Sequence, residues 1–407
     1  MAAPVLSPQL FTPEYYRNPH PALEWLRKNS PVHEFAFPVD DVPTWIVTRY
    51  ADVHTVLGDN RFSTSGMKWA NDRARAAGMV FALGTVVEDI VTVLDPPDHT
   101  RIRKLAMGAF TPRRIEEWRA TVDRIVDEAL DDLAAQDEPD LMSFAGAVPA
   151  GAIGSLLGFR LDRFNDMLHA IDRAFTTDPE LQDDRTRAFV EIGEYGRELI
   201  EERRKNPADD LTSSFIQARD GEDRLSEQEL VSMLAVMIMA GLDTTRGVLG
   251  SASLGLMAHP DQVELLNARP DLLPNAVEEF IRYEGALATG LLRFAAEDLE
   301  LGGVVIPKGS PVLASLLSAN RDPEAFPDAD RLDITRTGVR HVGLGHGLHN
   351  CLGAALARME VGTGISKLFR RFPNMRLTVP REEVEWAPTW LIRSPLHLPV
   401  DLGAPAS

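Results

Sequence analysis

The spacing of apolar residues near the N-terminus predicts a few short strands and then a segment without regular structure. Apolar runs bounded by turn residues at 31–37 and 45–48 predict strands, and a helical pattern follows at 50–57. From 63 to 95 the apolar residues are numerous but have no period. Long segments of this kind are either disordered or cover a functional site. Because this one carries so many apolar side chains, we predict that it covers a substrate site.

Beyond residue 97 the pattern is strongly helical. An amphipathic stretch runs from 111 to about 135, and others follow to about 204. The clearest helix begins at Ser226, whose hydroxyl forms a capping box with Glu229, and no stop signal occurs before Pro260. About 32 helical residues span ~50 Å, which is enough to cross a domain.

Strands return late in the chain, since short apolar runs occur near 304–306, 312–316, 376–379 and 397–400. Helices nevertheless dominate. We therefore predict a mainly α fold with a minor β part, in which residues 1–407 form a single domain around a central helix at 226–259. Apolar residues surround much of that helix, which indicates that it is buried.

The charge balance argues against one class of partner. The chain has 61 Asp and Glu against 42 Lys and Arg, a formal charge of −19, and neither end carries a basic arm. Such a surface repels phosphate backbones, so we expect no nucleic acid partner. The first residues lack the pattern of a secretory leader, and the longest apolar stretch is far shorter than the ~20 residues that span a bilayer. We expect a cytoplasmic protein that does not enter a membrane.

The single cysteine, Cys351, excludes an intramolecular disulfide and a cysteine-rich zinc module. It lies near the end of a loop, 343–353, in which alternating glycines let the backbone lie against a large flat group. A helical pattern follows at once, and a helix N-terminus favours thiolate. These residues leave three interpretations open: a buried free cysteine, a haem iron with a thiolate ligand, and a zinc site. The zinc site would use Cys351 with His341, His346 and His349.

The loop resembles the cysteine-ligand loop of the cytochrome P-450 family of haem-thiolate monooxygenases, which reads Phe-Gly-x-Gly-x-His-x-Cys-x-Gly. It departs from that pattern at Leu344, where the family usually has Phe. The resemblance implies the P-450 fold and a haem b whose iron is bound by Cys351. It also implies that shielding or redox tuning of the sulfur differs because of Leu344.

The predicted central helix contains a second motif of the family. Residues 240–245 are similar to Ala/Gly-Gly-x-Asp/Glu-Thr-Thr. By itself the stretch also fits a helix kink, because Gly weakens a helix and Thr can bond a carbonyl one turn earlier. The resemblance assigns Thr244 a hydrogen bond to dioxygen and Asp243 the relay of protons from solvent.

Charged residues elsewhere match the family in the same order. Glu279 and Arg282 match Glu-x-x-Arg, and the resemblance gives Arg331 as the third member of a buried lock on the cysteine loop. Without the resemblance, a pair three residues apart is an ordinary surface ion pair.

A fourth set resembles the residues that bind the haem propionates. His99 and Arg103 match the family's propionate-binding helix, and Arg293 and His349 are further partners by position. Arginine suits this role because its planar fork binds both oxygens of a carboxylate. Taken singly, each of these cations could be a solvated charge.

The resemblance implies a monooxygenase that reduces dioxygen with electrons from a ferredoxin and an NAD(P)H-dependent ferredoxin reductase. Between Arg331 and Arg381 the chain has nine basic residues against two acidic ones, Asp333 and Glu360. In an acidic chain this excess predicts a surface on which an acidic ferredoxin docks. A helix face that offsets acidic neighbours is the alternative.

The substrate is predicted to be a hydrophobic small molecule that the enzyme hydroxylates or epoxidises. The expected pocket walls are largely apolar, and they comprise Val87, Val236, Ala240, Ala288, Thr289, Leu291 and Ile392. The chain looks like soluble actinobacterial members that tailor macrolides, other polyketides or terpenoids. The alternatives are a fatty-acid or xenobiotic hydroxylase and, outside enzymes, a haem-thiolate ligand sensor.

Overall fold

The structure is a computed structural model that describes residues 8–80, 85, 88–108, 110–176, 182–218 and 225–404. The α-helices are α1 Pro13–Arg17, α2 His20–Asn29, α3 Tyr50–Gly58, α4 Gly66–Trp69, α5 Asp72–Ala76, α6 Asp98–Met107, α7 Pro112–Ala134, α8 Leu141–Leu157, α9 Phe164–Ala174, α10 Gln182–Lys205, α11 Leu211–Ala218, α12 Glu227–Met257, α13 Pro260–Ala268, α14 Leu273–Glu284, α15 Leu316–Asn320 and α16 Ala354–Arg371. The strands are β1 Val32–Phe37, β2 Val42–Val47, β3 Phe62–Ser63, β4 Arg293–Ala295, β5 Leu299–Leu301, β6 Val304–Ile306, β7 Pro311–Ala314, β8 Arg376–Leu377 and β9 Val400–Asp401. The predicted fold class, mainly α with a minor β part, is confirmed.

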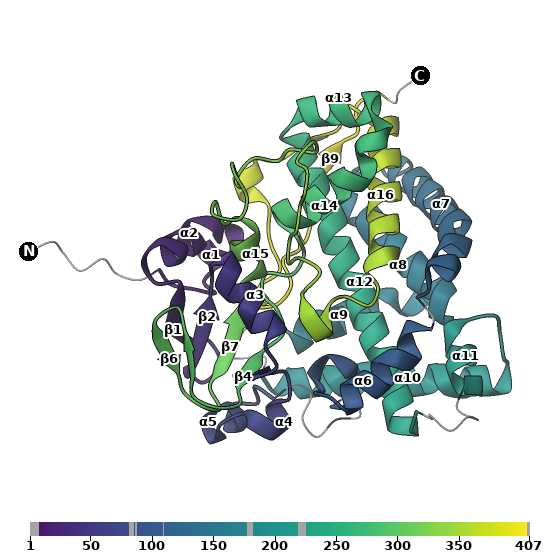
Figure 1. The fold of residues 1–407 in the computed structure, drawn as a ribbon. Helices are drawn as coiled ribbons and strands as arrows, with labels where there is room; N and C mark the ends of the chain where they lie inside the picture. The colour runs from purple at the N-terminus through teal and green to yellow at the C-terminus, as the bar shows by residue number, and fades with distance from the viewer. Residues whose placement is uncertain are drawn as a thin grey trace, which may run out of the picture.

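The long helix α12 organises the helical part of the molecule (Figure 1). Its N-terminus has the predicted capping box, because the Ser226 hydroxyl accepts a bond from the Glu229 amide and the Glu229 carboxylate accepts one from the Ser226 amide. Helices α8, α10, α14 and α16 all pack against it. Gly241 allows the approach of α8, since a Cβ there would lie 2.4 Å from Ile153 Cδ1.

Helix α12 is the one described helix whose length and apolar composition would suffice to cross a membrane. Of its most apolar window, 78% is buried inside the protein. The apolar surface of this helix is therefore used for packing against its neighbours.

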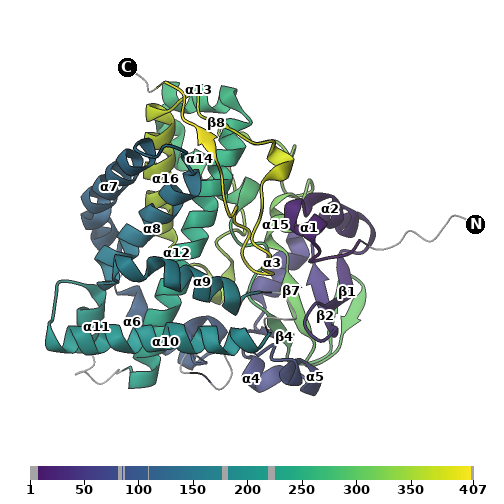
Figure 2. The same ribbon diagram turned by 180° about the vertical axis from the view of Figure 1, so that it is seen from behind.

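The main sheet lies to one side of the helices, as Figure 1 and the reverse view in Figure 2 both show. The main sheet has the order β1-β2-β7-β4-β3, and only its β2–β7 pair is parallel. Strands β5 and β6 form a second sheet, and β8 and β9 a third. The sequence patterns did not predict β4 and β5, which are only three residues long.

The predicted cover at 63–95 contains more regular structure than its pattern indicated. Helices α4 and α5 and the short 3-10 turn Val91–Val93 lie within it. Each is too short to show a helical period in the sequence. Residues 81–84, 86 and 87 lie outside the described residues, and so does the predicted pocket residue Val87.

Candidate active site

The cysteine loop is held by its own backbone and by α3. The Cys351 amide donates to the Leu344 carbonyl at 2.8 Å, which closes the loop before α16 begins. Gly347 has a φ of 72°, and a Cβ there would lie 2.8 Å from the Leu57 carbonyl oxygen. A side chain at this position would therefore push the loop away from α3.

The surroundings of Cys351 act on its thiol in opposite directions. Burial raises the pKa of the Cys351 thiol, whereas the Gly353 amide and the Arg103 and Arg358 guanidinium groups lower it. The lowering groups are the N–H donor and the positive charges that stabilise a thiolate at a helix N-terminus. Burial has the larger effect, so the pKa of the thiol is raised overall; the N–H donor and the two guanidinium groups are what the loop offers to a thiolate ligand.

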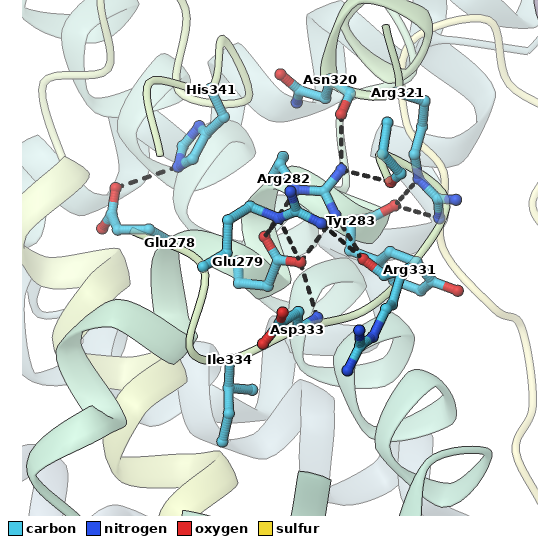
Figure 3. Close-up of polar contacts among 12 residues, drawn as sticks. Glu278, Glu279, Arg282, Tyr283, Asn320, Arg321, Arg331, Asp333, Ile334 and His341 are labelled. Atoms are coloured by element: carbon cyan, nitrogen blue, oxygen red, sulfur yellow. Dashed lines mark hydrogen bonds and ion pairs between the residues drawn. The ribbon is translucent and has the colours of Figure 1, made fainter. Parts of the chain in front are cut away.

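A buried ion pair on α14, Glu279 with Arg282, lies at the centre of a polar network (Figure 3). Arg282 and Glu279 have no exposed side-chain surface, and Arg282 Nε lies 2.7 Å from Glu279 Oε2. The five N–H groups of Arg282 donate to five acceptors: both oxygens of Glu279 and the carbonyls of Asn320, Ala329 and Arg331. The pair is therefore fully hydrogen-bonded, as a buried ion pair must be to be stable.

The third member of this lock differs from the prediction. Arg331 contributes its main-chain oxygen, while its side chain points away from Glu279 in Figure 3. The second cation on Glu279 is Arg336, whose Nε lies 3.2 Å from Glu279 Oε2. Asp328 has a φ of 51° in the turn that precedes this segment, and Arg336 also bonds the Asp328 carbonyl. The turn therefore brings Arg336, not Arg331, back to the carboxylate.

Two connections join the lock to the cysteine loop. Asn320 accepts from Arg282 through its carbonyl and from the Val342 amide through its side chain, at 2.9 Å. On α14, Glu278 pairs with His341 before the loop and with Arg358 after it. Helix α14 thus fixes the chain on both sides of Cys351.

Four side chains form a cationic cluster beside the loop: His99, Arg103, Arg293 and His349. The His99 and His349 ring centroids lie 4.3 Å apart, and Arg103 and Arg293 act electrostatically on both rings. Burial, followed by Arg293, His99 and Arg103, lowers the pKa of His349 to about 3. Burial also lowers the pKa of Arg293 to about 10, and its hydrogen bonds to described residues go only to main-chain carbonyls. Both ring nitrogens of the buried His99 have no hydrogen-bond partner in the described part of the chain.

The acid and the alcohol of the central helix occupy different environments. The Asp243 side chain is buried and lies 3.3 Å from Arg246. Burial raises the pKa of Asp243 to about 6, and the neighbouring Asp172 adds to that rise. Thr244 is only half-buried, and its hydroxyl donates to the Ala240 carbonyl at 2.5 Å. Ala240 itself is exposed although it lies in the middle of a buried helix, so this face of α12 borders an open space.

An apolar pocket lies between the cover, the ends of α9 and α10, and the chain that follows α14. Its walls include Phe37, Phe175, Phe189, Leu291 and Trp390. Thr64 also lines it, and the Thr64 hydroxyl lies 3.3 Å from His349 Nε2. The pocket therefore adjoins the cationic cluster.

The predicted pocket residues are only partly brought together. Leu291 lines this pocket, whereas Val236, Ala288, Thr289 and Ile392 are buried in the packing around it. Thr289 donates its hydroxyl to the Trp390 carbonyl, so it holds a wall residue in place. The aromatic walls come from β1, α9, α10 and the C-terminal segment, and no local motif in the sequence marked them.

Comparisons with known proteins place this site in a family. The Cytochrome P450 family model matches residues 7–390. Mycinamicin IV hydroxylase/epoxidase from Micromonospora griseorubida is 40% identical over 92% of this chain and 93% of that enzyme. The chain belongs to the cytochrome P450 family. Vitamin D(3) 25-hydroxylase from Pseudonocardia autotrophica is 37% identical to this P450 over 97% of this chain and 96% of its own length.

Solved P450 structures have the same fold. Myxobacterial CYP267B1 in complex with myristic acid matches with a TM-score of 0.90 and 36% identity, over 97% of this chain and 99% of that one. The tirandamycin C-bound monooxygenase TamI matches with a TM-score of 0.88 and 38% identity, over 96% and 99%. The P450 is accordingly a monooxygenase with a thiolate-ligated haem iron that receives electrons from a redox partner and acts on a hydrophobic substrate.

The residues of this P450 fit a haem. Neither ring nitrogen of His99 has a hydrogen-bond partner among the described residues, and Arg293 is a buried cation without an ion pair there. The two propionates of a haem would supply hydrogen-bond acceptors and negative charge to both residues. The zinc interpretation does not fit, because His341 pairs with Glu278 and His346 stacks on His54 at 3.6 Å. Among the described residues no group of three His, Cys, Asp or Glu could hold a metal ion.

One buried acid near the site makes stability depend on pH. Glu360 on α16 has an unpartnered Oε2, and burial raises its pKa to about 8 despite a hydrogen bond from Thr245. Between the unfolded pKa of about 4.5 and the folded value, the native state holds a proton that the unfolded chain has lost. The free energy of unfolding should therefore fall as pH rises through this window, by up to about 1.4 kcal/mol per unit.

We expect Glu360→Gln to remove the fall in the free energy of unfolding with rising pH, so that the variant becomes more stable than the wild type between about pH 5 and pH 8. Urea unfolding at both ends of the range measures the difference, and Glu382→Gln on the exposed surface is the control. Parallel pH profiles for wild type and Glu360→Gln would show that Glu360 is ionised in the folded protein.

Proposed function

We propose that this P450 hydroxylates or epoxidises a macrolide, another polyketide or a terpenoid in secondary-metabolite tailoring. The observation that supports it is the pocket with aromatic and aliphatic walls beside the cationic cluster, which suits an apolar molecule. Relatives of this chain include Mycinamicin IV hydroxylase/epoxidase and 6-deoxyerythronolide B hydroxylase. A fatty-acid hydroxylase is the second candidate, because CYP267B1 was solved with myristic acid.

We further propose haem b as the cofactor. His99, Arg103, Arg293 and His349 would hold its propionates, and Cys351 would be its ligand. When bound, the haem supplies the reduction of dioxygen and the transfer of one oxygen atom to the substrate. Glu279, Arg282, Asn320 and Arg336 hold the loop that carries the ligand.

Protons reach the site through α12 in this proposal. Asp243 has a pKa of about 6, so it can hold or release a proton near neutral pH, and Arg246 keeps its carboxyl in place. Thr244 lies one residue further along, on the half-buried face of the helix. The Thr244 hydroxyl can give up its hydrogen bond to the Ala240 carbonyl and bond instead to a group in the open space beside α12. It can then pass the proton to that group.

Replacing Thr244 tests this relay. We expect Thr244→Ala to consume NAD(P)H but to form about tenfold less product per NAD(P)H, because positioned proton transfer contributes ~10²–10⁴ in rate. Thr244→Ser keeps the hydroxyl and should retain most of the coupling. Ser251→Ala on the same helix removes a buried hydroxyl without a partner and is the control. Fully coupled turnover by Thr244→Ala would refute the relay.

We propose a ferredoxin with an NAD(P)H-dependent reductase as the electron source, docking near the cysteine loop in the cytoplasm. Much of the predicted basic surface is offset, since Lys367 pairs with Asp123 and Asp127, and Arg371 pairs with Asp131. The exposed Lys104 and Arg340 form no ion pair in the described part of the chain. Lys104 adjoins Arg103, which bonds Asn350 beside the ligand.

Charge reversal tests the docking surface. We expect Lys104→Glu with Arg340→Glu to slow reduction by ferredoxin about tenfold at low salt, with a smaller effect at high salt. Arg370→Glu with Arg371→Glu should have the smaller effect, because Arg371 is already neutralised by Asp131. Equal effects of the two double variants, or none from the first, would contradict docking at Lys104 and Arg340.

A further inference from the structure

The apolar pocket is lined by one cation among the described residues. This cation, Arg185, lies on α10, is half-buried and lines the pocket with Phe175 and Phe189. Its Nη2 donates to the Gly78 carbonyl at 3.0 Å, the one hydrogen bond that its five N–H groups form within the described part of the chain. It forms no ion pair with a described residue, and burial, partly offset by the charge of Asp40, lowers its pKa.

Arg185 is held against the cover by a glycine. Gly78 has a φ of 65°, and a Cβ there would lie 3.0 Å from Arg185 Nη2. The close approach of the guanidinium to the backbone therefore depends on the missing side chain. This contact fixes one edge of the guanidinium and leaves the other donors available to a ligand.

Two acids, Glu88 and Asp89, also line the pocket. Among the described residues, Asp40 is the carboxylate that acts electrostatically on Arg185. Burial and then Glu88, Glu229 and Asp98 raise the pKa of Asp89. Within the described part of the chain, the pocket therefore combines one cation, Arg185, with two acids that form no ion pair with it.

We propose that Arg185 binds a carboxylate of the substrate, so that the natural substrate is an apolar molecule with an acidic group at one end. This inference rests on the proposed monooxygenase function and narrows its substrate class. Arginine forms paired hydrogen bonds with a carboxylate, and these are stronger where the surroundings are apolar. Glu88 and Asp89 in the lining repel a carboxylate, so the acidic group of the substrate is favoured beside Arg185 and its apolar part against the aromatic walls.

Binding of tetradecanoic acid and of its methyl ester tests the proposal. Both are titrated into the haem-loaded protein at about pH 7.5, where the acid is ionised. Binding is followed by the substrate-induced spin shift and, independently, by the rise in melting temperature. The acid is expected to bind about tenfold or more tightly than the ester, and Arg185→Gln to remove this preference by weakening the acid alone.

Two further variants complete the experiment. Arg185→Lys keeps the charge and should retain part of the preference. Arg187→Gln is the control, since Arg187 lies on the same helix but pairs with Asp184. Three results would overturn the role of Arg185: equal affinities for the acid and the ester, an equal loss of affinity for both in Arg185→Gln, or no binding of the acid. Any of these results in a protein with a haem-thiolate spectrum would leave the proposed monooxygenase function standing.

Discussion

Glu279→Gln is expected to destabilise the folded protein by about 3–5 kcal/mol, a large part of the total stability of a typical domain. The substitution preserves shape but removes the charge that balances Arg282 and Arg336. Arg282 has no exposed surface, so water cannot replace the lost partner. A buried cation without its counter-ion is among the most costly defects that one substitution can make.

The matched control is Arg331→Ala. Arg331 contributes to the lock only through its main-chain carbonyl, and its side chain is exposed. We therefore expect a change within about 0.5 kcal/mol. Urea unfolding followed by circular dichroism measures both variants. A large loss in Arg331→Ala with little change in Glu279→Gln would contradict the lock as the structure shows it.

Cys351→Ser is expected to abolish monooxygenation, because the hydroxyl cannot replace the thiolate that donates electron density to the iron. The Cys351 amide still bonds Leu344 in this variant, and the lock on α14 is untouched. Loss of activity should therefore occur in a folded protein. Product formation, haem content and the circular dichroism spectrum are measured together.

Leu348→Ala is the control for this variant. Leu348 lies in the same loop, and 39% of its surface is exposed. Its truncation should leave the haem content and the absorption spectrum unchanged. If Cys351→Ser forms product at the wild-type rate, another residue must be the ligand.

Local patterns were sufficient for the parts of this protein that depend on neighbours in sequence. The capping box at Ser226 predicted the start of α12, because both of its hydrogen bonds lie within one turn. The spacing of Glu279 and Arg282 likewise predicted an ion pair, but a surface one; its complete burial was implied only by the family resemblance.

Features that depend on tertiary packing were not predicted. Arg336 reaches Glu279 from the irregular chain between α15 and the cysteine loop, whose course has no pattern in the sequence. The pocket walls at Phe37 and Trp390 lie more than three hundred residues apart in sequence, yet their rings lie 6.3 Å apart. Pairing of Lys367 and Arg371 with acids of α7 likewise could not be inferred from the basic stretch alone.

The central claim is that Cys351 ligates a haem iron as a thiolate, and the reduced carbon monoxide difference spectrum of the wild-type protein tests it most directly. We predict the red-shifted Soret band that distinguishes a haem with a thiolate ligand from one with a histidine ligand. A Soret band at the shorter wavelength of histidine-ligated haem, or no band in a protein that has been supplied with haem, would contradict the claim.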